Sequence, residues 1–404
     1  MVQLIRGASF VVSLPGVGVS RSCPSCWTWV APSRAPVSGM TVPDDEETTM
    51  RIAITGATGN VGSALLRRLA ARGGHDVVGV VRRRPREVAP FAGVDWHIVD
   101  LSLAGDAEAL RAAFAGVDAV VHLAWAFQPT HSEDYLARLG VDGTRRVIEA
   151  VVAEGVPHLV HMSSVGAYSP KQDDAPVDES WPTDGVPSST YSRHKAAAER
   201  LLDRLESDGS GPTVTRLRPG IVGQASAGSA LLRYGLPGLV PRALLSHVPV
   251  LPLDRRLAIP MVHADDLAEA IVRSLESGAP GAFNLAADPA VTTEDIAQVL
   301  GARAVHVPAA AVRAAVSASW HARLQPLDAG WIDLAFAVPL MNTTRARSEL
   351  GWTPATGALR VLAETVHGMQ DGAADASPVL RERTMAGSLG RFLRDGPVSR
   401  RRRA

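Results

Sequence analysis

The chain has 404 residues, and its 41 lysine and arginine residues are balanced by 41 aspartate and glutamate residues, which gives a formal net charge of zero. This balance excludes the strongly basic surface that attracts nucleic acids and anionic membranes, so we expect neither partner. No apolar run approaches the roughly 18 residues needed to cross a bilayer. We therefore expect a soluble, cytoplasmic protein.

The first 49 residues differ in composition from the rest of the chain. They are rich in proline, serine and glycine, so we expect residues 1–49 to be a disordered extension rather than a domain. A signal peptide is the weaker alternative, because Pro15 interrupts the apolar stretch near the start. Met50 is an alternative start of translation. The only cysteines, Cys23 and Cys26, lack a second ligand pair, so no metal site is expected.

Between these 49 residues and about residue 370, strand-like and helix-like segments alternate. The segments between the apolar runs space their apolar residues as amphipathic helices do. Strands that are apolar on both faces and joined by helices are typical of a parallel sheet covered on both sides. The sequence therefore predicts an α/β fold with a doubly wound parallel sheet. Its expected strands are residues 51–55, 76–81, 96–100, 118–124 and 158–164.

Three glycines follow the first predicted strand with the spacing GxxGxxG. Glycine permits a tight turn and lets a pyrophosphate approach the backbone, and the N–H groups at the start of the next helix attract phosphate oxygens. A strand before the glycines and a helix after them make this pattern more specific than the glycines alone. We therefore expect a dinucleotide to bind here. The expected contacts are Gly56, Thr58, Gly59, Asn60, Val61 and Gly62.

The end of the second predicted strand indicates which dinucleotide is bound. A site that prefers NAD places an acidic residue about 20 residues after the glycines, where it accepts hydrogen bonds from the ribose. Here that position falls near Val81, and Arg82 and Arg83 follow it. An arginine there would bind a 2′-phosphate through charge-assisted hydrogen bonds. We expect NADP, with Arg82 as the first contact and Arg83 as the second. NAD is the alternative if these arginines form only a solvated loop.

Lys195 stands out because Lys171 is the only other lysine among the basic residues. It follows Tyr191 by four residues, so the two side chains lie on one face of a predicted helix. A tyrosine whose pKa is about 10 is a poor acid or base at neutral pH, and a neighbouring ammonium lowers that pKa. Lysine also has three rotatable donors that could hold ribose hydroxyls. The spacing alone is common on helix surfaces, so a chance pair is the alternative.

Together with RPGIVG at 218–223, VHADDLA at 262–268 and NTTRARSELGWTP at 342–354, these motifs follow the order found in the extended short-chain dehydrogenase/reductase family. The chain resembles this family, also called the NAD-dependent epimerase/dehydratase family, over about residues 50–365. The resemblance implies a Rossmann domain that holds a nicotinamide cofactor. It also implies that Ser164 hydrogen-bonds the substrate oxygen, that Tyr191 transfers the proton and that Lys195 sets the pKa of Tyr191.

The resemblance also implies a domain plan and further cofactor contacts at the carboxyl ends of the strands. A Rossmann part is expected at about 50–220 and 261–286, a smaller substrate part at 221–260 and 287–365, and a polar, basic tail at 371–404. For Asp100, which could accept from the adenine amino group, capping of its strand is an equal alternative. The further expected contacts are Asp100, Leu101, Leu123, Ala124, Ser163, Pro219 and Ile221.

Two positions depart from the family pattern. Gly140 stands where the family often has an asparagine in the helix after the fourth strand. Ile259 and Pro260 stand near the point where nucleotide-sugar enzymes usually carry an arginine that binds pyrophosphate. Arg255 and Arg256 are nearby substitutes for it. Trp125 could instead line a pocket for a less charged ligand, or belong to the core.

Three functions of different classes remain compatible with these motifs. The first is a reductase or dehydrogenase that transfers hydride between a carbonyl or secondary alcohol and the cofactor. The second is a sugar epimerase or dehydratase, including nucleotide-sugar enzymes, that keeps its cofactor bound. The third is a dinucleotide sensor without catalytic activity, which the intact Tyr191 and Lys195 disfavour. Proteins of all three classes bind small molecules, so we expect a small-molecule substrate or ligand. A homodimer is a further possibility.

Overall fold

The computed structural model describes residues 49–126, 132–209, 211–235, 241–325, 327–384 and 387. The expectations for residues 1–48, which include Cys23 and Cys26, and for the chain after residue 387 lie outside these ranges. Among the described residues, no helix combines the length and the apolar composition that crossing a membrane requires. No cluster of three or more potential metal-ligating side chains occurs in the same ranges.

The main sheet of the described chain has seven strands, all paired in parallel, in the order β10-β6-β5-β4-β1-β2-β3. The strand order reverses direction between β1 and β4, as in doubly wound folds. This confirms the predicted fold class. The strands are β1 Arg51–Thr55, β2 Asp76–Val81, β3 Asp95–Ile98, β4 Ala119–His122, β5 His158–Met162, β6 Thr213–Pro219 and β10 Gly281–Leu285.

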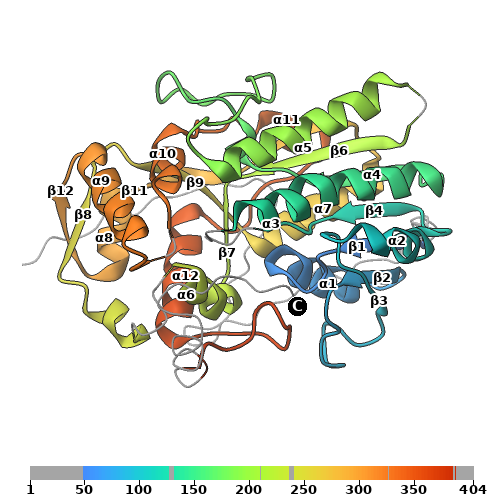
Figure 1. The fold of residues 1–404 in the computed structure, drawn as a ribbon, viewed down its shortest axis with the longest axis horizontal. Coiled ribbons are helices and arrows are strands. Elements are labelled where there is room, and N and C mark those ends of the chain that lie inside the picture. The colour runs from blue at the N-terminus through green and yellow to red at the C-terminus, as the bar shows by residue number, and fades with distance from the viewer. Residues whose placement is uncertain are drawn as a thin grey trace, which may run out of the picture. The chain divides into compact units, whose positions relative to one another are not determined.

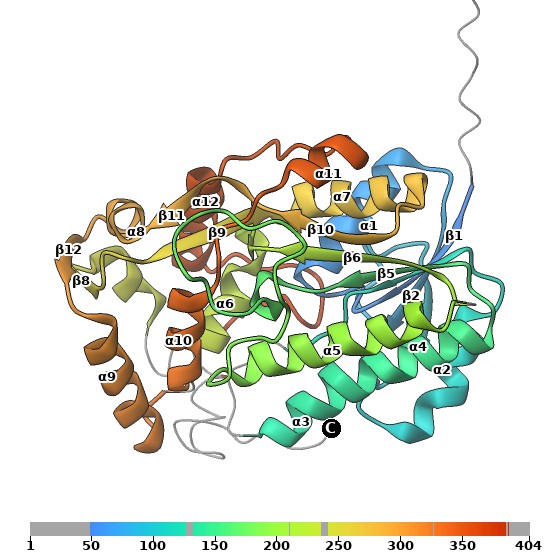
Figure 2. The same cartoon turned by 90° about the horizontal axis from the view of Figure 1, so that it is seen from above.

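Helices cover both faces of this sheet, as Figures 1 and 2 show. One face carries α1 Asn60–Arg72, α7 Ala264–Ser277 and α11 Thr344–Glu349, and its core includes fully buried Leu65, Ile271 and Trp352. The other face carries α2 Ala107–Phe114, α4 Gly143–Ala153 and α5 Thr190–Ser207, with Phe114 and Leu202 in its core. The apolar strands are buried between two cores, which explains their nearly continuous apolar runs.

The helix that follows β4 contains an irregular turn. It begins as α3 Glu133–Ala137, widens into a π-helical turn at Arg138–Asp142 and continues as α4. Such turns are rare and are often found at functional sites. Gly140, the residue at the position of the family asparagine, lies inside this turn and is buried.

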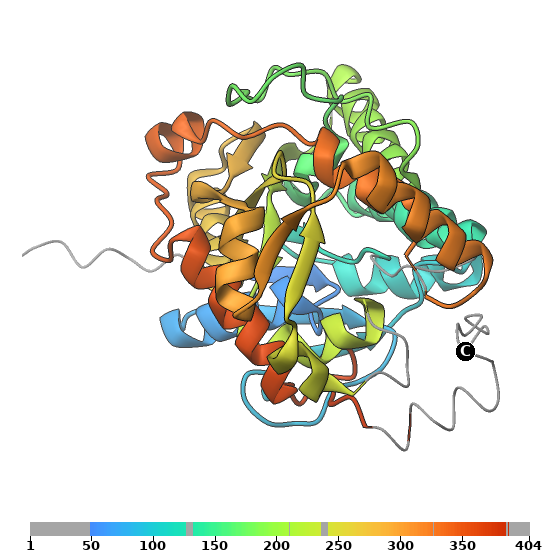
Figure 3. The same cartoon turned by 90° about the vertical axis from the view of Figure 1, so that its left-hand side faces the viewer.

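A second group of elements lies at one end of the main sheet, the end that Figure 3 turns toward the viewer. Three strands form a small sheet in the order β11-β9-β7, and β8 pairs with β12. Their bounds are β7 Ile221–Gly223, β8 Val250–Leu253, β9 Ala258–His263, β11 Ala287–Thr292 and β12 Arg303–His306. The helices are α6 Gly228–Gly235, α8 Thr293–Leu300, α9 Ala309–His321, α10 Ala329–Ala337 and α12 Ala358–Asp371.

The chain after α12 stays in contact with the folded protein. Ser377 and Leu380 are each 1% exposed, and Leu380 packs against Ala227 and Ala230. The Ser377 hydroxyl donates a 2.8 Å hydrogen bond to the backbone oxygen of Thr58 in the glycine turn. The described start of the segment expected to be a polar tail is therefore attached to the predicted cofactor site.

Candidate active site

The glycine turn between β1 and α1 is packed so closely that a side chain would not fit at Gly56 or Gly62. Gly56 has a φ of +72°, and a Cβ there would lie 2.8 Å from the Ala124 nitrogen. A Cβ on Gly62 would lie 2.4 Å from the Gly56 oxygen. Gly59 is the N-cap of α1, which begins without a side-chain cap and without an acidic residue in its first turn. These features leave the helix start suited to an anion, so the turn fits a dinucleotide.

Other residues of the turn attach it to neighbouring segments. The Asn60 amide donates to the Val222 oxygen at 3.1 Å and accepts from the Gln224 amide at 2.7 Å. Thr58 is buried and accepts the hydrogen bond from Ser377, and Val61 packs against the main core. The backbone oxygen of Thr58 and the side chains of Asn60 and Val61 therefore attach the turn to neighbouring segments.

Arg82 and Arg83 follow β2 directly and are exposed. Arg82 donates to the Tyr135 hydroxyl on α3. Partial burial lowers the pKa of Arg83, and the positive charges of Arg381 and Arg82 lower it further. Three arginines thus meet at this edge of the sheet. Arg381, from the C-terminal segment, could not be predicted because it is about 300 residues away in sequence.

The strand ends place the other expected contacts along one edge, but several of their polar groups already have local partners. The Asp100 carboxylate accepts from the Ser102 nitrogen at 2.9 Å and from the Ser102 hydroxyl at 2.7 Å. These bonds agree with the alternative in which Asp100 caps the end of its strand. Leu101 is buried. The backbone nitrogens of Leu123 and Ala124 donate to Thr55.

The remaining expected contacts differ in exposure. The Ser163 hydroxyl donates to the Glu199 carboxylate at 2.5 Å, so its side chain is engaged in the protein interior. Pro219 is buried at the end of β6. Ile221 begins β7 and is 50% exposed.

The structure brings Ser164 and Tyr191 together. Ser164 follows β5, and its hydroxyl oxygen accepts from the Gly166 nitrogen at 3.0 Å. A Cβ on Gly166 would lie 2.9 Å from Cε1 of Tyr191, so the glycine makes room for the phenol ring. Burial raises the pKa of Tyr191 to about 12, and a hydrogen bond with Ser164 opposes that rise.

Lys195 lies one helical turn after Tyr191 on α5, and its ammonium contacts a backbone oxygen and an indole ring. Its Nζ donates to the Met162 oxygen at 2.8 Å and lies 3.6 Å from the ring centroid of Trp125. Burial lowers its pKa to about 7, against the raising effect of Glu199. We expected the ammonium to lower the pKa of Tyr191. Here burial of the phenol outweighs other influences, and the ammonium is directed at a carbonyl and an indole.

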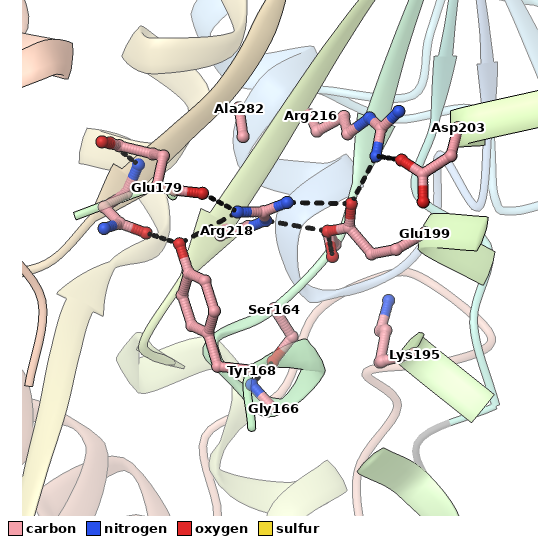
Figure 4. A network of polar contacts seen from close by, with 12 residues as sticks. Ser164, Gly166, Tyr168, Glu179, Lys195, Glu199, Asp203, Arg216, Arg218 and Ala282 are labelled. Atoms are coloured by element: carbon pink, nitrogen blue, oxygen red, sulfur yellow. Dashed lines mark hydrogen bonds and ion pairs between the residues drawn. The ribbon is translucent and has the colours of Figure 1, made fainter. Parts of the chain in front are cut away.

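Glu199, one further turn along α5, is the centre of a buried ion-pair network (Figure 4). It is 0% exposed and binds Arg218 through both oxygens, at 2.9 and 3.1 Å, and Arg216 at 2.9 Å. Burial opposes its ionisation, but Arg218, Ser163 and Arg216 outweigh this and lower the pKa of Glu199 to about 2. The network ties α5 to β6 and fixes the helix that carries Tyr191 and Lys195.

Two indole rings flank Tyr191. Trp125 meets it edge-on with ring centroids 6.4 Å apart, and Trp331 of α10 lies at 5.3 Å with a 33° tilt. The same side chains line a narrow pocket beside His194 and Asp328, with about 10 Å³ of free space. Sequence reasoning singled out Trp125 but missed Trp331, because nothing local connects residue 331 to this site.

Residues 52–286 match the model of the NAD dependent epimerase/dehydratase family. The chain belongs to this family. This confirms the family resemblance found in the sequence.

The relatives of this chain include a named reductase and a longer uncharacterized protein. A 3-diazoavenalumate denitrifying reductase from a Streptomyces species is 32% identical over 325 residues, which cover 76% of this chain and 96% of that protein. An uncharacterized protein of Mycobacterium tuberculosis is 28% identical over 314 residues, and this match covers 76% of this chain but only 29% of that longer protein.

The solved structures show the same fold. The UDP-glucose 4-epimerase of Thermus thermophilus, in complex with NAD, has a TM-score of 0.59 and 23% identity and covers 80% of this chain and 100% of that one. At this identity the likeness shows the fold and not the activity.

Proposed function

We propose that this family member is an NADP-dependent reductase or dehydrogenase that acts on a carbonyl or secondary alcohol of a small molecule. The observation that carries the proposal is the hydrogen-bonded pair of Ser164 and Tyr191, with Lys195 one helical turn further on. The bound cofactor would supply the hydride. Side chains of this protein would orient the substrate and transfer the proton.

In the direction of reduction, Ser164 would orient the substrate and Tyr191 would supply the proton. Ser164 would hydrogen-bond the carbonyl oxygen and orient it. Because burial raises its pKa to about 12, Tyr191 stays protonated at neutral pH and can donate its proton to that oxygen. Lys195, with a pKa lowered to about 7, can exist in both protonation states near neutral pH.

Tyr191→Phe tests the role of the phenol. We expect turnover with NADPH and a panel of small carbonyl compounds to fall by roughly 100-fold or more, because the proton donor is lost. The NADPH dissociation constant should change little, since the ring and its contacts remain. Tyr234→Phe is the matched control, because it removes a hydroxyl from α6. Full turnover in Tyr191→Phe would reject the assignment.

A reductase is favoured over an epimerase by the relative at 32% identity, a reductase that matches over 96% of its length. The epimerase or dehydratase alternative is supported by the fold of the UDP-glucose 4-epimerase alone. Arg256, a suggested substitute for a pyrophosphate-binding arginine, is paired with Asp254 at 2.9 Å. This pairing gives the nucleotide-sugar alternative less support.

The preference for NADP rests on Arg82 and Arg83, which directly follow β2. A site that prefers NAD has an acidic residue near this point, and this chain has none there. Titration of the protein with NADPH and with NADH should give tighter binding of NADPH. Arg82→Ala should weaken the binding of NADPH and leave the affinity for NADH nearly unchanged, because only NADPH carries the 2′-phosphate. Arg360→Ala, on α12, is the control for loss of a positive charge. Equal affinities for the two cofactors in the wild type would contradict the preference.

A further inference from the structure

The ammonium of Lys195 lies over the face of an indole ring. Its Nζ is 3.6 Å from the ring centroid of Trp125, and Lys195 is only 2% exposed. An aromatic face attracts a cation through its quadrupole, and the attraction is stronger where water is excluded. Trp125 comes three residues after the end of β4, at the carboxyl edge of the main sheet.

The position of this ring depends on a glycine in the neighbouring helix. A Cβ at Gly140 would lie 3.1 Å from Cζ2 and 3.2 Å from Cη2 of Trp125. Even alanine would therefore press against the indole. Gly140 is the position at which the family pattern often has asparagine, so the space of a missing side chain is filled here by the ring of Trp125.

Other groups around Lys195 have partners of their own. Glu199 lies one turn after Lys195 on α5 and interacts with its charge. The Glu199 oxygens are bound to Arg216, Arg218 and Ser163. The histidines that interact with the Lys195 charge are His161 on β5 and His122 on β4, and burial lowers the pKa of both. They stay neutral at neutral pH.

Among the described residues, the ammonium contacts the Met162 oxygen and the Trp125 ring. The same indole also meets the ring of Tyr191 edge-on. One side chain is thus in contact with both helix residues of the site.

We propose that Trp125 is a positioning residue that fixes the ammonium of Lys195, and that residue 140 is glycine because the indole needs its space. The consequence for turnover rests on the proposed function, but the position of the ammonium does not. Trp125 acts here through Lys195.

The scarcity of lysine provides a direct readout. Lysine labelled with ¹³C at the ε carbon gives two signals in the full chain, one from Lys195 and one from Lys171, which pairs with Asp174. Protons above an aromatic face are shifted upfield, so we expect the Lys195 signal of the nucleotide-free protein to be displaced upfield. In Trp125→Leu that displacement should disappear while the Lys171 signal stays in place.

A pH titration of the same signals measures the charge of Lys195. Leucine keeps the site apolar but offers no aromatic face, so the pKa of Lys195 should fall below its wild-type value in Trp125→Leu. Trp125→Phe should restore the upfield displacement and the pKa in part. Trp331→Leu, which removes the other indole beside Tyr191, is the matched control and should leave the Lys195 signal unchanged.

Gly140→Ala tests the second half of the proposal without touching either partner. It should move the Lys195 signal in the same direction as Trp125→Leu, because the added methyl group displaces the ring. A Lys195 signal that is not displaced in the wild type, or that is unchanged in Trp125→Leu, would overturn the proposal. So would a Gly140→Ala protein that folds and keeps the wild-type signal.

Measurements of turnover show whether the positioning role of Trp125 or the proposed function has failed. In Trp125→Leu we expect kcat to fall more than KM changes, and the limb of the kcat profile that reports Lys195 to move to lower pH. If the signals respond as expected while Tyr191→Phe keeps full turnover, the positioning stands and the proposed function fails. If Tyr191→Phe is inactive and the signals do not respond, the positioning fails alone.

Discussion

At the scale of single residues, Glu199 is the side chain on which most of the buried charge depends. It is fully buried and faces Arg216 and Arg218, each of which is 5% exposed. Removing one partner of a buried ion pair leaves the other charge without compensation. Glu199 therefore matters more for stability than a charged residue on the exposed face of a helix would.

Glu199→Gln should lower the free energy of unfolding by about 3–5 kcal/mol, because buried Arg218 loses its carboxylate partner. Arg216 loses one of its carboxylates and keeps Asp203 and Glu206. The pKa of Glu199 is lowered from 4.5 to about 2 in the folded protein. Its contribution to stability is thus fully present above pH 4.5 and is lost as the pH falls from 4.5 toward 2. Urea unfolding of both proteins across this range measures it.

The matched control is Asp203→Asn, which removes another carboxylate from Arg216 but at a side chain that is 56% exposed. We expect that variant to lose less than about 1 kcal/mol. If Glu199→Gln were as stable as Asp203→Asn near neutral pH, the buried network would not stabilise the fold in the way described.

At the scale of elements, the strands and the helix face of Tyr191 and Lys195 could be predicted because their signals are local. Apolar runs mark buried strands, and a spacing of four residues places two side chains on one helix face. The helix bearing them is α5, from Thr190 to Ser207. The strand predicted at 96–100 begins one residue and ends two residues too late, since β3 runs from Asp95 to Ile98 and Asp100 caps the chain after it.

What could not be predicted depends on contacts between distant segments. Glu199 looks like a solvated helix residue in the sequence, and its burial is due to arginines on β6. The direction of the Lys195 ammonium depends on Trp125 and on the missing side chain of Gly140. Neither the period of the apolar residues nor the family pattern carries this information.

At the scale of the whole molecule, the described C-terminal segment links the glycine turn to α6. Leu380 is 1% exposed and packs beside Ala227 and Ala230. Ser377, three residues earlier, is bonded to Thr58 in the cofactor turn. Residues that look like a polar tail in the sequence thereby become part of the support for the predicted cofactor site.

Leu380→Ala should lower the free energy of unfolding by about 2–5 kcal/mol, because it leaves a cavity where a buried side chain was packed. It should also weaken NADPH binding, because the segment that contacts Thr58 is then less firmly held. Leu324→Ala, at a leucine that is 59% exposed, is the control and should change neither quantity measurably. Thermal unfolding and NADPH titration provide the two readouts. Unchanged stability in Leu380→Ala would show that the segment does not support the fold.

The most direct test of the central claim is to follow the hydride itself. NADPH that carries deuterium at the transferred position of the nicotinamide ring is incubated with the enzyme and a panel of small carbonyl compounds, and the products are analysed by mass spectrometry. A reductase transfers the deuterium to a product alcohol and releases an equal amount of NADP⁺, and Tyr191→Phe transfers almost none. A product that is rearranged but not reduced, with the cofactor recovered in its starting oxidation state, would contradict the account and indicate an epimerase.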